Sequence, residues 1–296
     1  MFQGVYTAII TPFRNGGVDF GGLKELIDRQ ISAGVDGIIP CGTTGESATL
    51  SEDETAAVIE KTIEFTKGRV KVIAGVGSND TAKTIRMGKR AHELGADGLL
   101  VITPYYNKPT QLGLITHFKA VSDALPTAPI ILYNVPGRTG ISLSVESIKE
   151  LAKIDTIVAL KEATGDMAFA ARIISACGDD LAILSGDDIT ALPLWSIGGV
   201  GVVSVTSNLI PDRMVEMWRQ FRRTESLAAR RNHHALVPLF DGLFIEANPI
   251  PIKTLVAKYT GCCGRELRLP MTPLSVEAEA VLDVICRRLE IGPEST

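Results

Sequence analysis

The stretch TIVALKEATG, residues Thr156–Gly165, is a short apolar run that ends in Lys161 and then in polar residues and a glycine. Four consecutive apolar residues before the lysine are typical of a strand in a parallel sheet covered on both faces. Seven more such runs occur at intervals that leave room for one helix each. The eight predicted strands are Val5–Thr11, Gly37–Gly42, Val70–Val76, Gly98–Thr103, Pro129–Asn134, Thr156–Glu162, Leu181–Gly186 and Gly201–Ser207.

The intervals between the runs show the apolar–polar periodicity of amphipathic helices. The predicted helices are Leu23–Gly34, Glu52–Thr66, Thr81–Gly95, Gly113–Leu125, Ser144–Leu151, Ala168–Cys177 and Ile189–Gly198. Eight such repeats predict an α/β fold, a closed (β/α)8 TIM barrel.

After Ser207 the strand signal stops, and the remaining patterns are helical. These helices are expected at Pro211–Phe221, Ser226–Phe244, Ile250–Tyr259 and Ser275–Leu289. We therefore predict a catalytic barrel over residues 1–224 and a small C-terminal helical module over residues 225–296.

The composition is that of a compact globular protein. The chain has 296 residues, 45% of them hydrophobic, and a mean hydropathy of +0.20. A net charge of -4 provides no electrostatic attraction to nucleic acid. No run approaches the roughly 18 apolar residues of a membrane span, and the start lacks a secretory signal. We expect a cytoplasmic protein with neither a nucleic-acid nor a membrane partner.

The cysteines and histidines do not indicate a metal site. The five cysteines are an odd number without regular spacing, which favours free thiols. Cys262–Cys263 has no histidine nearby, and His233–His234 lies in a polar helical stretch. We interpret both pairs as structural and predict neither a metal nor a cofactor.

Polar clusters follow five of the predicted strands directly. They are GTTGESATL (Gly42–Leu50), PYYNKP (Pro104–Pro109), YNVPGRTG (Tyr133–Gly140), KEATG (Lys161–Gly165) and SGDD (Ser185–Asp188). Because the chemistry of a β/α barrel occurs at the carboxyl ends of its strands, these clusters predict one site on one rim.

Lys161, Tyr133 and Arg138 supply the reactive groups of this rim. Burial disfavours the charged form of an amine, and a neutral Lys161 amine can attack a ketone to form an imine. Tyr133 is suited to proton transfer, and Arg138 to a bidentate grip on a carboxylate. The alternatives are a lysine that reaches solvent, a tyrosine that fills space at the rim and an arginine in a surface ion pair.

Thr43 and Thr44 lie between two glycines that let a ligand approach the backbone. Their N–H groups and hydroxyls can bind a small carboxylate, and the alternative is an ordinary turn. Tyr105 and Tyr106 are expected at the tip of a projecting loop.

On these motifs the sequence closely resembles the dihydrodipicolinate synthase family of the pyruvate-dependent aldolase superfamily. The resemblance covers essentially the whole chain. Besides the rim clusters, it is carried by GVYTAIITPF (Gly4–Phe13), GVGVVSVTSN (Gly199–Asn208), NPIPIK (Asn248–Lys253) and LPMTP (Leu269–Pro273).

The resemblance implies a set of catalytic residues. Lys161 would form a Schiff base with pyruvate. Thr43, Tyr106 and Tyr133 would form a proton relay, with Tyr106 supplied by the neighbouring subunit. The minimal catalytic unit would then be a dimer, and we expect a homotetramer built as a dimer of dimers.

The resemblance also implies the substrate-binding residues. Thr44 would bind the pyruvate carboxylate, and Arg138 the carboxylate of L-aspartate 4-semialdehyde. Backbone groups of Gly186 and Val203 would line the pocket. The expected reaction condenses the two substrates to 4-hydroxy-tetrahydrodipicolinate, in the diaminopimelate route to lysine.

Two other functions are weighed against this one. N-acetylneuraminate lyase and the 2-keto-3-deoxy sugar-acid aldolases share the lysine and the tyrosine but generally lack an arginine at the position of Arg138. A barrel that binds a keto acid without converting it would not need the lysine, tyrosine and threonine together.

The resemblance bears on regulation as well. Family members that respond to L-lysine bind it at the dimer interface, at positions matching Ser47, Ala48, Glu52, Thr55, Asn79, Lys83 and Tyr105. Sensitive enzymes have a glutamate where this chain has Lys83. Since the Lys83 ammonium would repel the cationic ligand, we expect weak or absent inhibition.

Overall fold

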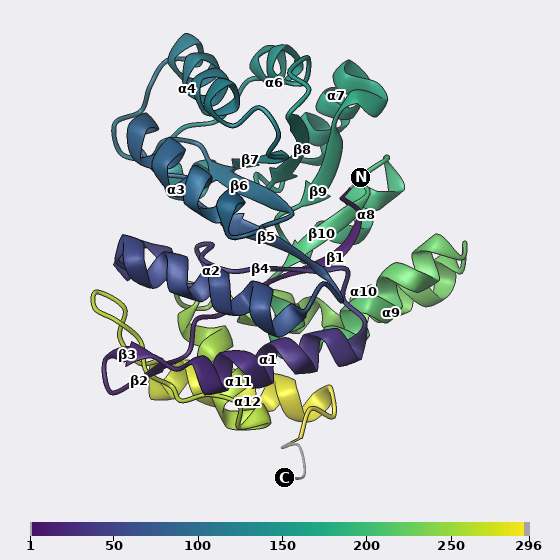
Figure 1. The fold of residues 1–296 in the computed structure, drawn as a ribbon. Coiled ribbons are helices and arrows are strands. Elements are labelled where there is room, and N and C mark those ends of the chain that lie inside the picture. Colours follow the sequence, from purple (N-terminus) through teal and green to yellow (C-terminus); the bar gives the residue numbers. More distant parts are fainter. Residues whose placement is uncertain (1, 293–296) are drawn as a thin grey trace.

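A computed structural model describes residues 2–292 of the chain. Eight parallel strands close into a barrel, in which the last strand pairs with the first (Figure 1). They are β1 (Gly4–Ala8), β4 (Gly37–Ile39), β5 (Lys71–Gly75), β6 (Gly98–Ile102), β7 (Ile130–Asn134), β8 (Ile157–Glu162), β9 (Ala182–Ser185) and β10 (Gly201–Ser204). Seven of them lie within a predicted run and β1 begins one residue before its run, so the barrel prediction is confirmed.

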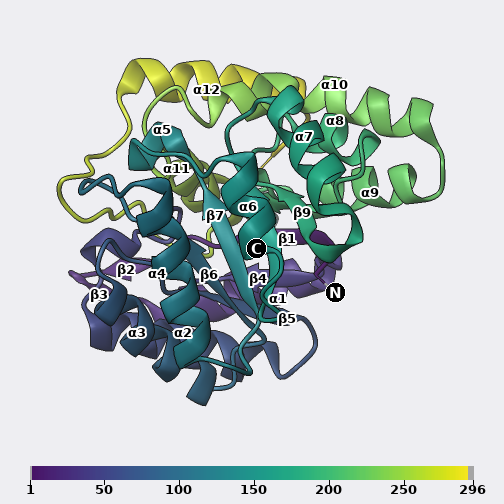
Figure 2. The same cartoon turned by 90° about the horizontal axis from the view of Figure 1, so that it is seen from above.

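Helices surround the barrel and connect its strands, as the view from above shows (Figure 2). They are α1 (Phe20–Ala33), α2 (Glu52–Thr66), α3 (Thr81–Glu93), α4 (Gln111–Ala124), α6 (Val145–Leu151), α7 (Met167–Cys177) and α8 (Ala191–Ser196). Short 3-10 turns occur at η1 (Ser47–Thr49), η2 (Gly178–Asp180) and η3 (Thr206–Asn208). All seven of the α-helices named here were predicted.

Local sequence explains where these helices begin and end. The Ser51 hydroxyl accepts a hydrogen bond from the Glu54 N–H, and the Glu54 carboxylate accepts one from the Ser51 N–H. This capping box satisfies N–H groups that the first turn of α2 leaves free. α1 ends at Gly34, whose φ of 85° is readily available only to glycine.

Two short strands and one short helix were not predicted. Strands β2 (Phe13–Arg14) and β3 (Gly17–Val18) form a hairpin outside the barrel. The helix α5 (Pro136–Thr139) begins at a proline and ends before Gly140, which has a φ of 70°. Arg138 lies on this short helix, which can begin here because Pro136 is well suited to the first turn of a helix.

The C-terminal helices are α9 (Pro211–Arg222), α10 (Ser226–Gly242), α11 (Ile250–Thr260) and α12 (Val276–Arg288). All four were predicted. α10 packs on α9 and α12, and α11 contacts η3, just beyond β10. In Figure 1 the green and yellow C-terminal helices lie beside α1, so they cover one side of the barrel.

Side chains of the strands point alternately into the barrel and out toward the helices. Ile131 and Tyr133 belong to an interior cluster, whereas Ile130 and Leu132 pack in the layer between strands and helices. At the amino end of the barrel the Phe2 ring lies edge-on to Tyr6. This packing closes the amino end, and polar groups gather at the other.

The adjacent cysteines and the adjacent histidines lie in the packed structure and not at a predicted site. The five cysteines are unpaired. His233 is buried, and its Nε2 lies 2.8 Å from the carbonyl oxygen of Ile189. Over residues 2–292, no group of three or more histidine, cysteine or acidic side chains is placed to bind a metal ion. Within the same residues, no helix is long and apolar enough to cross a membrane.

The layer between strands and helices makes a testable contribution to stability. Phe118 on α4 is fully buried, so Phe118→Ala removes a large side chain and leaves a cavity. We expect it to lower the free energy of unfolding by about 3 to 5 kcal/mol, measured by urea unfolding. Leu112→Ala, on the same helix at a side chain 73% exposed, is the control and should change it by less than about 0.5 kcal/mol. An equal loss of unfolding free energy in the two variants would contradict the burial of Phe118 in this layer.

Candidate active site

Lys161 and Tyr133 are brought together by the register of two strands. β7 and β8 are parallel, and Tyr133 pairs with Lys161. Because paired residues on neighbouring strands point to the same face, both side chains enter the barrel. The Lys161 Nζ lies 4.0 Å from the centroid of the Tyr133 ring, and each residue is only 6% exposed. Lys161 therefore does not extend into solvent, contrary to the alternative weighed from the sequence.

A buried bridge joins the ends of these two strands. The Asn134 Nδ2 donates to Glu162 Oε2 over 3.0 Å, and the Thr164 N–H donates to Glu162 Oε1. Burial raises the pKa of the Glu162 carboxyl, and its hydrogen bonds oppose that shift. Asn134 and Glu162 directly follow Tyr133 and Lys161, so the bridge fixes the strand ends that carry the reactive pair. Neither residue was predicted from the sequence to belong to the site.

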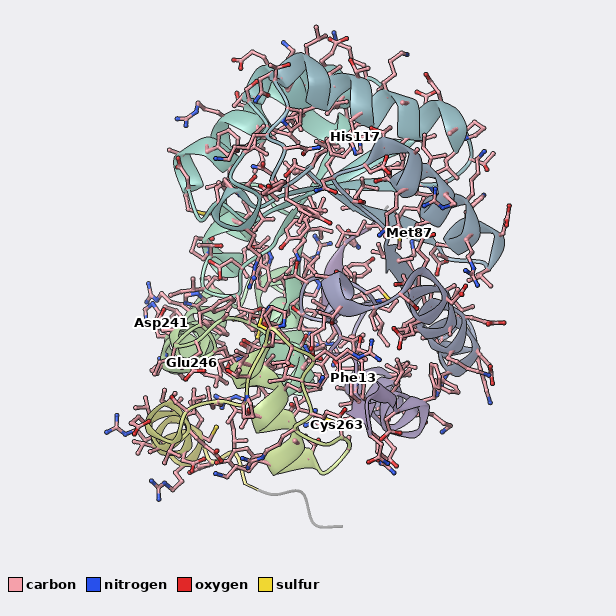
Figure 3. The ribbon with its side chains drawn as sticks, turned by 90° about the vertical axis from the view of Figure 1, so that its left-hand side faces the viewer. Phe13, Met87, His117, Asp241, Glu246 and Cys263 are labelled. Atoms are coloured by element: carbon pink, nitrogen blue, oxygen red, sulfur yellow. The ribbon has the colours of Figure 1, made fainter. Side chains whose placement is uncertain are left out.

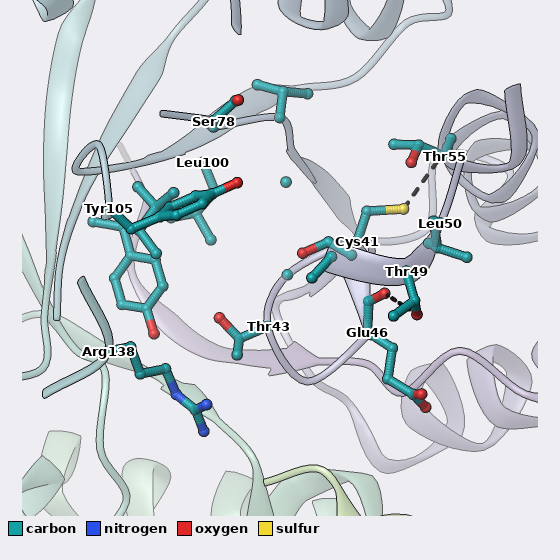
Figure 4. Close-up of a pocket in the computed structure, with 18 of the residues that line it drawn as sticks. Cys41, Thr43, Glu46, Thr49, Leu50, Thr55, Ser78, Leu100, Tyr105 and Arg138 are labelled. Carbon is teal, nitrogen blue, oxygen red and sulfur yellow. Dashed lines mark hydrogen bonds between the residues drawn. The ribbon is translucent and has the colours of Figure 1, made fainter. Parts of the chain in front are cut away.

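Thr43, Tyr133 and Arg138 line one cavity of about 360 Å³. Figure 4 shows Thr43, on the loop after β4, and Arg138, on α5, directed toward the same open space. Tyr105, from the loop after β6, reaches into the cavity as well. The expected convergence of strand-end clusters on one rim is therefore present for β4, β6 and β7.

Thr44 and Arg138 are connected through Asn248, which precedes α11. The Asn248 Nδ2 donates to Thr44 Oγ1 over 2.9 Å, and the Asn248 carbonyl oxygen accepts from an Arg138 Nη over 3.3 Å. All three residues come from different parts of the chain. Asn248 was quoted from the sequence only as part of a motif, and no local signal gave it a role.

Gly186 packs against the lysine, and Val203 lies in the interior of the barrel. A Cβ on Gly186 would lie 3.1 Å from the Lys161 Cε and 2.6 Å from the Ala163 Cβ. Glycine is therefore needed for this close approach. Val203 pairs with Tyr6 across β10 and β1 and is buried in the interior of the barrel.

Tyr106 is not brought to this site. It lies at a loop tip with a φ of 72° and is 88% exposed. The loop is connected to the chain before α3 through Asn107, whose Nδ2 donates to the Asn79 carbonyl oxygen. The expectation of a projecting loop is confirmed, whereas within one chain Tyr106 stays away from Lys161.

Thr43, Tyr133 and Arg138 line one cavity, and the buried Lys161 amine lies against the Tyr133 ring. Thr44 is joined to Arg138 through Asn248. An amine can form an imine with a keto acid, a phenol can transfer protons, and the other groups can bind carboxylates. Together, fold and site define a class of protein, the (β/α)8-barrel lyases that form a Schiff base.

Within that class, the chain belongs to the dihydrodipicolinate synthetase family, whose model matches residues 1–288. It is 51% identical over 274 residues to the 4-hydroxy-tetrahydrodipicolinate synthase of Nitratidesulfovibrio vulgaris, covering 92% of this chain and 93% of the relative.

Solved structures agree with this membership. The dihydrodipicolinate synthase of Aquifex aeolicus superposes with a TM-score of 0.97 at 43% identity, covering 99% of this chain and 100% of the other. A chloride-inhibited dihydrodipicolinate synthase from Acinetobacter baumannii, solved with pyruvate, gives a TM-score of 0.96 at 40% identity, covering 98% and 100%. The family resemblance inferred from the sequence is thereby confirmed.

The close approach at Gly186 can be tested. Gly186→Ala would push the added methyl group against the Lys161 side chain and move its amine. We expect turnover to fall by about tenfold or more, measured in a steady-state assay, because small displacements of reacting groups are costly. Gly137→Ala is the control, since a Cβ there meets no atom within 4 Å. Unchanged turnover in Gly186→Ala would show that the Lys161 side chain tolerates the displacement.

Proposed function

We propose that the chain condenses pyruvate with L-aspartate 4-semialdehyde through a Schiff base on Lys161 to give 4-hydroxy-tetrahydrodipicolinate, in the diaminopimelate route to lysine. The observation that carries this proposal is the buried Lys161 amine, 4.0 Å above the Tyr133 ring at the carboxyl edge of the barrel. Family membership and the name of the relative from Nitratidesulfovibrio vulgaris support the substrates.

The reaction follows from these groups. The Lys161 amine adds to the keto carbon of pyruvate, and loss of water gives the imine. Proton loss from the pyruvate methyl group gives an enamine, whose carbon attacks the aldehyde of the second substrate. The amino group of that substrate then attacks the imine carbon, closes the ring and releases the lysine. The protonated imine is the electron sink, so no metal enters the proposed mechanism.

Tyr133 and Thr43 transfer protons in this proposal, together with Tyr106 from a neighbouring subunit. The exposure of Tyr106 and its position at a loop tip support a role in another subunit. We accordingly propose a homotetramer built as a dimer of dimers, located in the cytoplasm.

We also propose that the chain divides into a catalytic barrel over residues 1–224 and a helical module over residues 225–296.

Thr44 binds the pyruvate carboxylate in this proposal, and Arg138 binds the carboxylate of L-aspartate 4-semialdehyde. Gly186 and Val203 line the pocket through their backbone. The proximity of Arg138 to Thr44, through Asn248, supports two carboxylate sites that lie close together. It also favours the synthase over the sugar-acid aldolases, which generally lack this arginine. A coupled assay with pyruvate and L-aspartate 4-semialdehyde, run beside one with N-acetylneuraminate, tests this choice.

The role of Lys161 can be tested by its removal. Lys161→Ala should lower turnover in the coupled assay by several orders of magnitude, because it removes the nucleophile. Lys161→Arg should not restore it, since a guanidinium stays protonated. Lys153→Ala replaces an exposed lysine and is the matched control, with wild-type activity expected. Activity near wild type in either Lys161 variant would remove this residue from the mechanism.

Replacing Arg138 should impair the use of L-aspartate 4-semialdehyde and leave the reaction with pyruvate intact. Arg138→Ala is expected to lower the catalytic efficiency with L-aspartate 4-semialdehyde by about a hundredfold, because a charge-assisted bidentate contact is lost. Imine formation with pyruvate, followed by trapping with borohydride, should be largely retained. If trapping fell as far as turnover, Arg138 would have a structural role instead.

Feedback by L-lysine should be weak or absent. Lys83 lines the cavity together with Ser47 and Thr55. The nearby Glu52 already accepts two hydrogen bonds from the Arg86 guanidinium, which lowers the pKa of its carboxyl and offsets its charge. A dose–response curve should show little inhibition at millimolar L-lysine, and Lys83→Glu should strengthen it. Full inhibition of the wild type below one millimolar would contradict this view.

A further inference from the structure

A second lysine, Lys253, is more completely buried than Lys161 and lies outside the reaction proposed above. It is 0% exposed and its Nζ lies 2.6 Å from Oε1 of Glu46, which is 3% exposed. The same Nζ lies 4.1 Å from the centroid of the Phe13 ring. Burial lowers the pKa of the Lys253 amine, and the Glu46 carboxylate opposes that shift. The structure thus contains a buried ion pair.

Glu46 ends the turn that carries Thr43 and Thr44. The Glu46 N–H donates to the Thr43 carbonyl oxygen over 3.0 Å, and Glu46 lines the same cavity as Thr43. Glu46 has a φ of 55°, a conformation that side-chain-bearing residues rarely adopt. Such a conformation persists only where surrounding contacts determine it. The buried ion pair is one such contact, because it fixes the end of the Glu46 side chain.

Three hydrogen-bonding contacts to this turn come from the C-terminal part of the chain. Lys253 lies on α11, and Asn248, just before α11, donates to Thr44. The Arg268 N–H donates to the second carboxylate oxygen of Glu46 over 3.1 Å. In Figure 3, Phe13 lies where the N-terminal part of the chain meets these C-terminal segments, near Cys263. The turn is thus connected to α11 at Thr44 and at Glu46.

We propose that Lys253 is a positioning residue, which through its ion pair with Glu46 sets the orientation of Thr43 and Thr44 toward pyruvate. This inference rests on the proposed function, in which those threonines relay protons and bind the pyruvate carboxylate. Buried ion pairs generally contribute little net stability compared with apolar or neutral side chains of the same shape. Replacing both partners therefore separates positioning from folding.

The test compares the wild type with the double variant Lys253→Met, Glu46→Gln. We expect a melting temperature close to that of the wild type, a kcat lower by about tenfold or more, a raised KM for pyruvate and an unchanged KM for L-aspartate 4-semialdehyde. Saturating pyruvate with borohydride should still modify the double variant. Lys258→Met, Asp283→Asn is the control, since it removes the two ion pairs that Lys258 of α11 makes with α12 and should keep wild-type kinetics.

Wild-type kcat and KM for pyruvate in a stably folded double variant would overturn the positioning role. If the double variant fails to fold, Glu46→Asp decides the question, because it keeps the charge but withdraws the carboxylate by one methylene. It should show the same pattern of kcat and KM, and wild-type kinetics would overturn the proposal. A wild-type enzyme that neither forms a pyruvate adduct nor turns over would instead overturn the proposed function.

Discussion

The parallel pairing of β7 with β8 is the interaction on which the site depends. Its register places Tyr133 next to Lys161, and the alternation of side chains directs both into the barrel. A shift of either strand by one residue would turn its own side chain toward the surrounding helices and leave the other inside. The Asn134–Glu162 hydrogen bond, one residue further along both strands, opposes such a shift. The geometry of the reactive pair is thus a consequence of backbone hydrogen bonding in a closed sheet.

The two buried lysines differ in what surrounds them. Lys253 is neutralised by the Glu46 carboxylate at 2.6 Å. Lys161 makes no ion pair with any carboxylate of residues 2–292 and faces the Tyr133 ring instead. This contrast in partners agrees with the proposed roles, in which Lys161 reacts with pyruvate and Lys253 fixes the turn that bears Thr43 and Thr44.

Sequence patterns were sufficient to predict the barrel, because strands that are buried on both faces of a sheet appear as apolar runs. TIVALKEATG contains one such run. The same patterns located Lys161 and Arg138, since strand ends in a barrel converge. They could not show the links from Asn248 to Thr44 or from Lys253 to Glu46, which join residues 204 and 207 positions apart. No periodicity records such contacts. The proposed role of Tyr106 requires a second chain, and one chain alone leaves this residue in solvent.

The most direct measurement is to incubate the wild-type enzyme with pyruvate and borohydride and to identify the modified residue by peptide mass spectrometry. The amine that forms the imine retains the reduced adduct after digestion, whereas a lysine without this role stays unmodified. We predict the adduct on the peptide that contains Lys161. An adduct on Lys253 or on another lysine, or the absence of any adduct, would contradict the account.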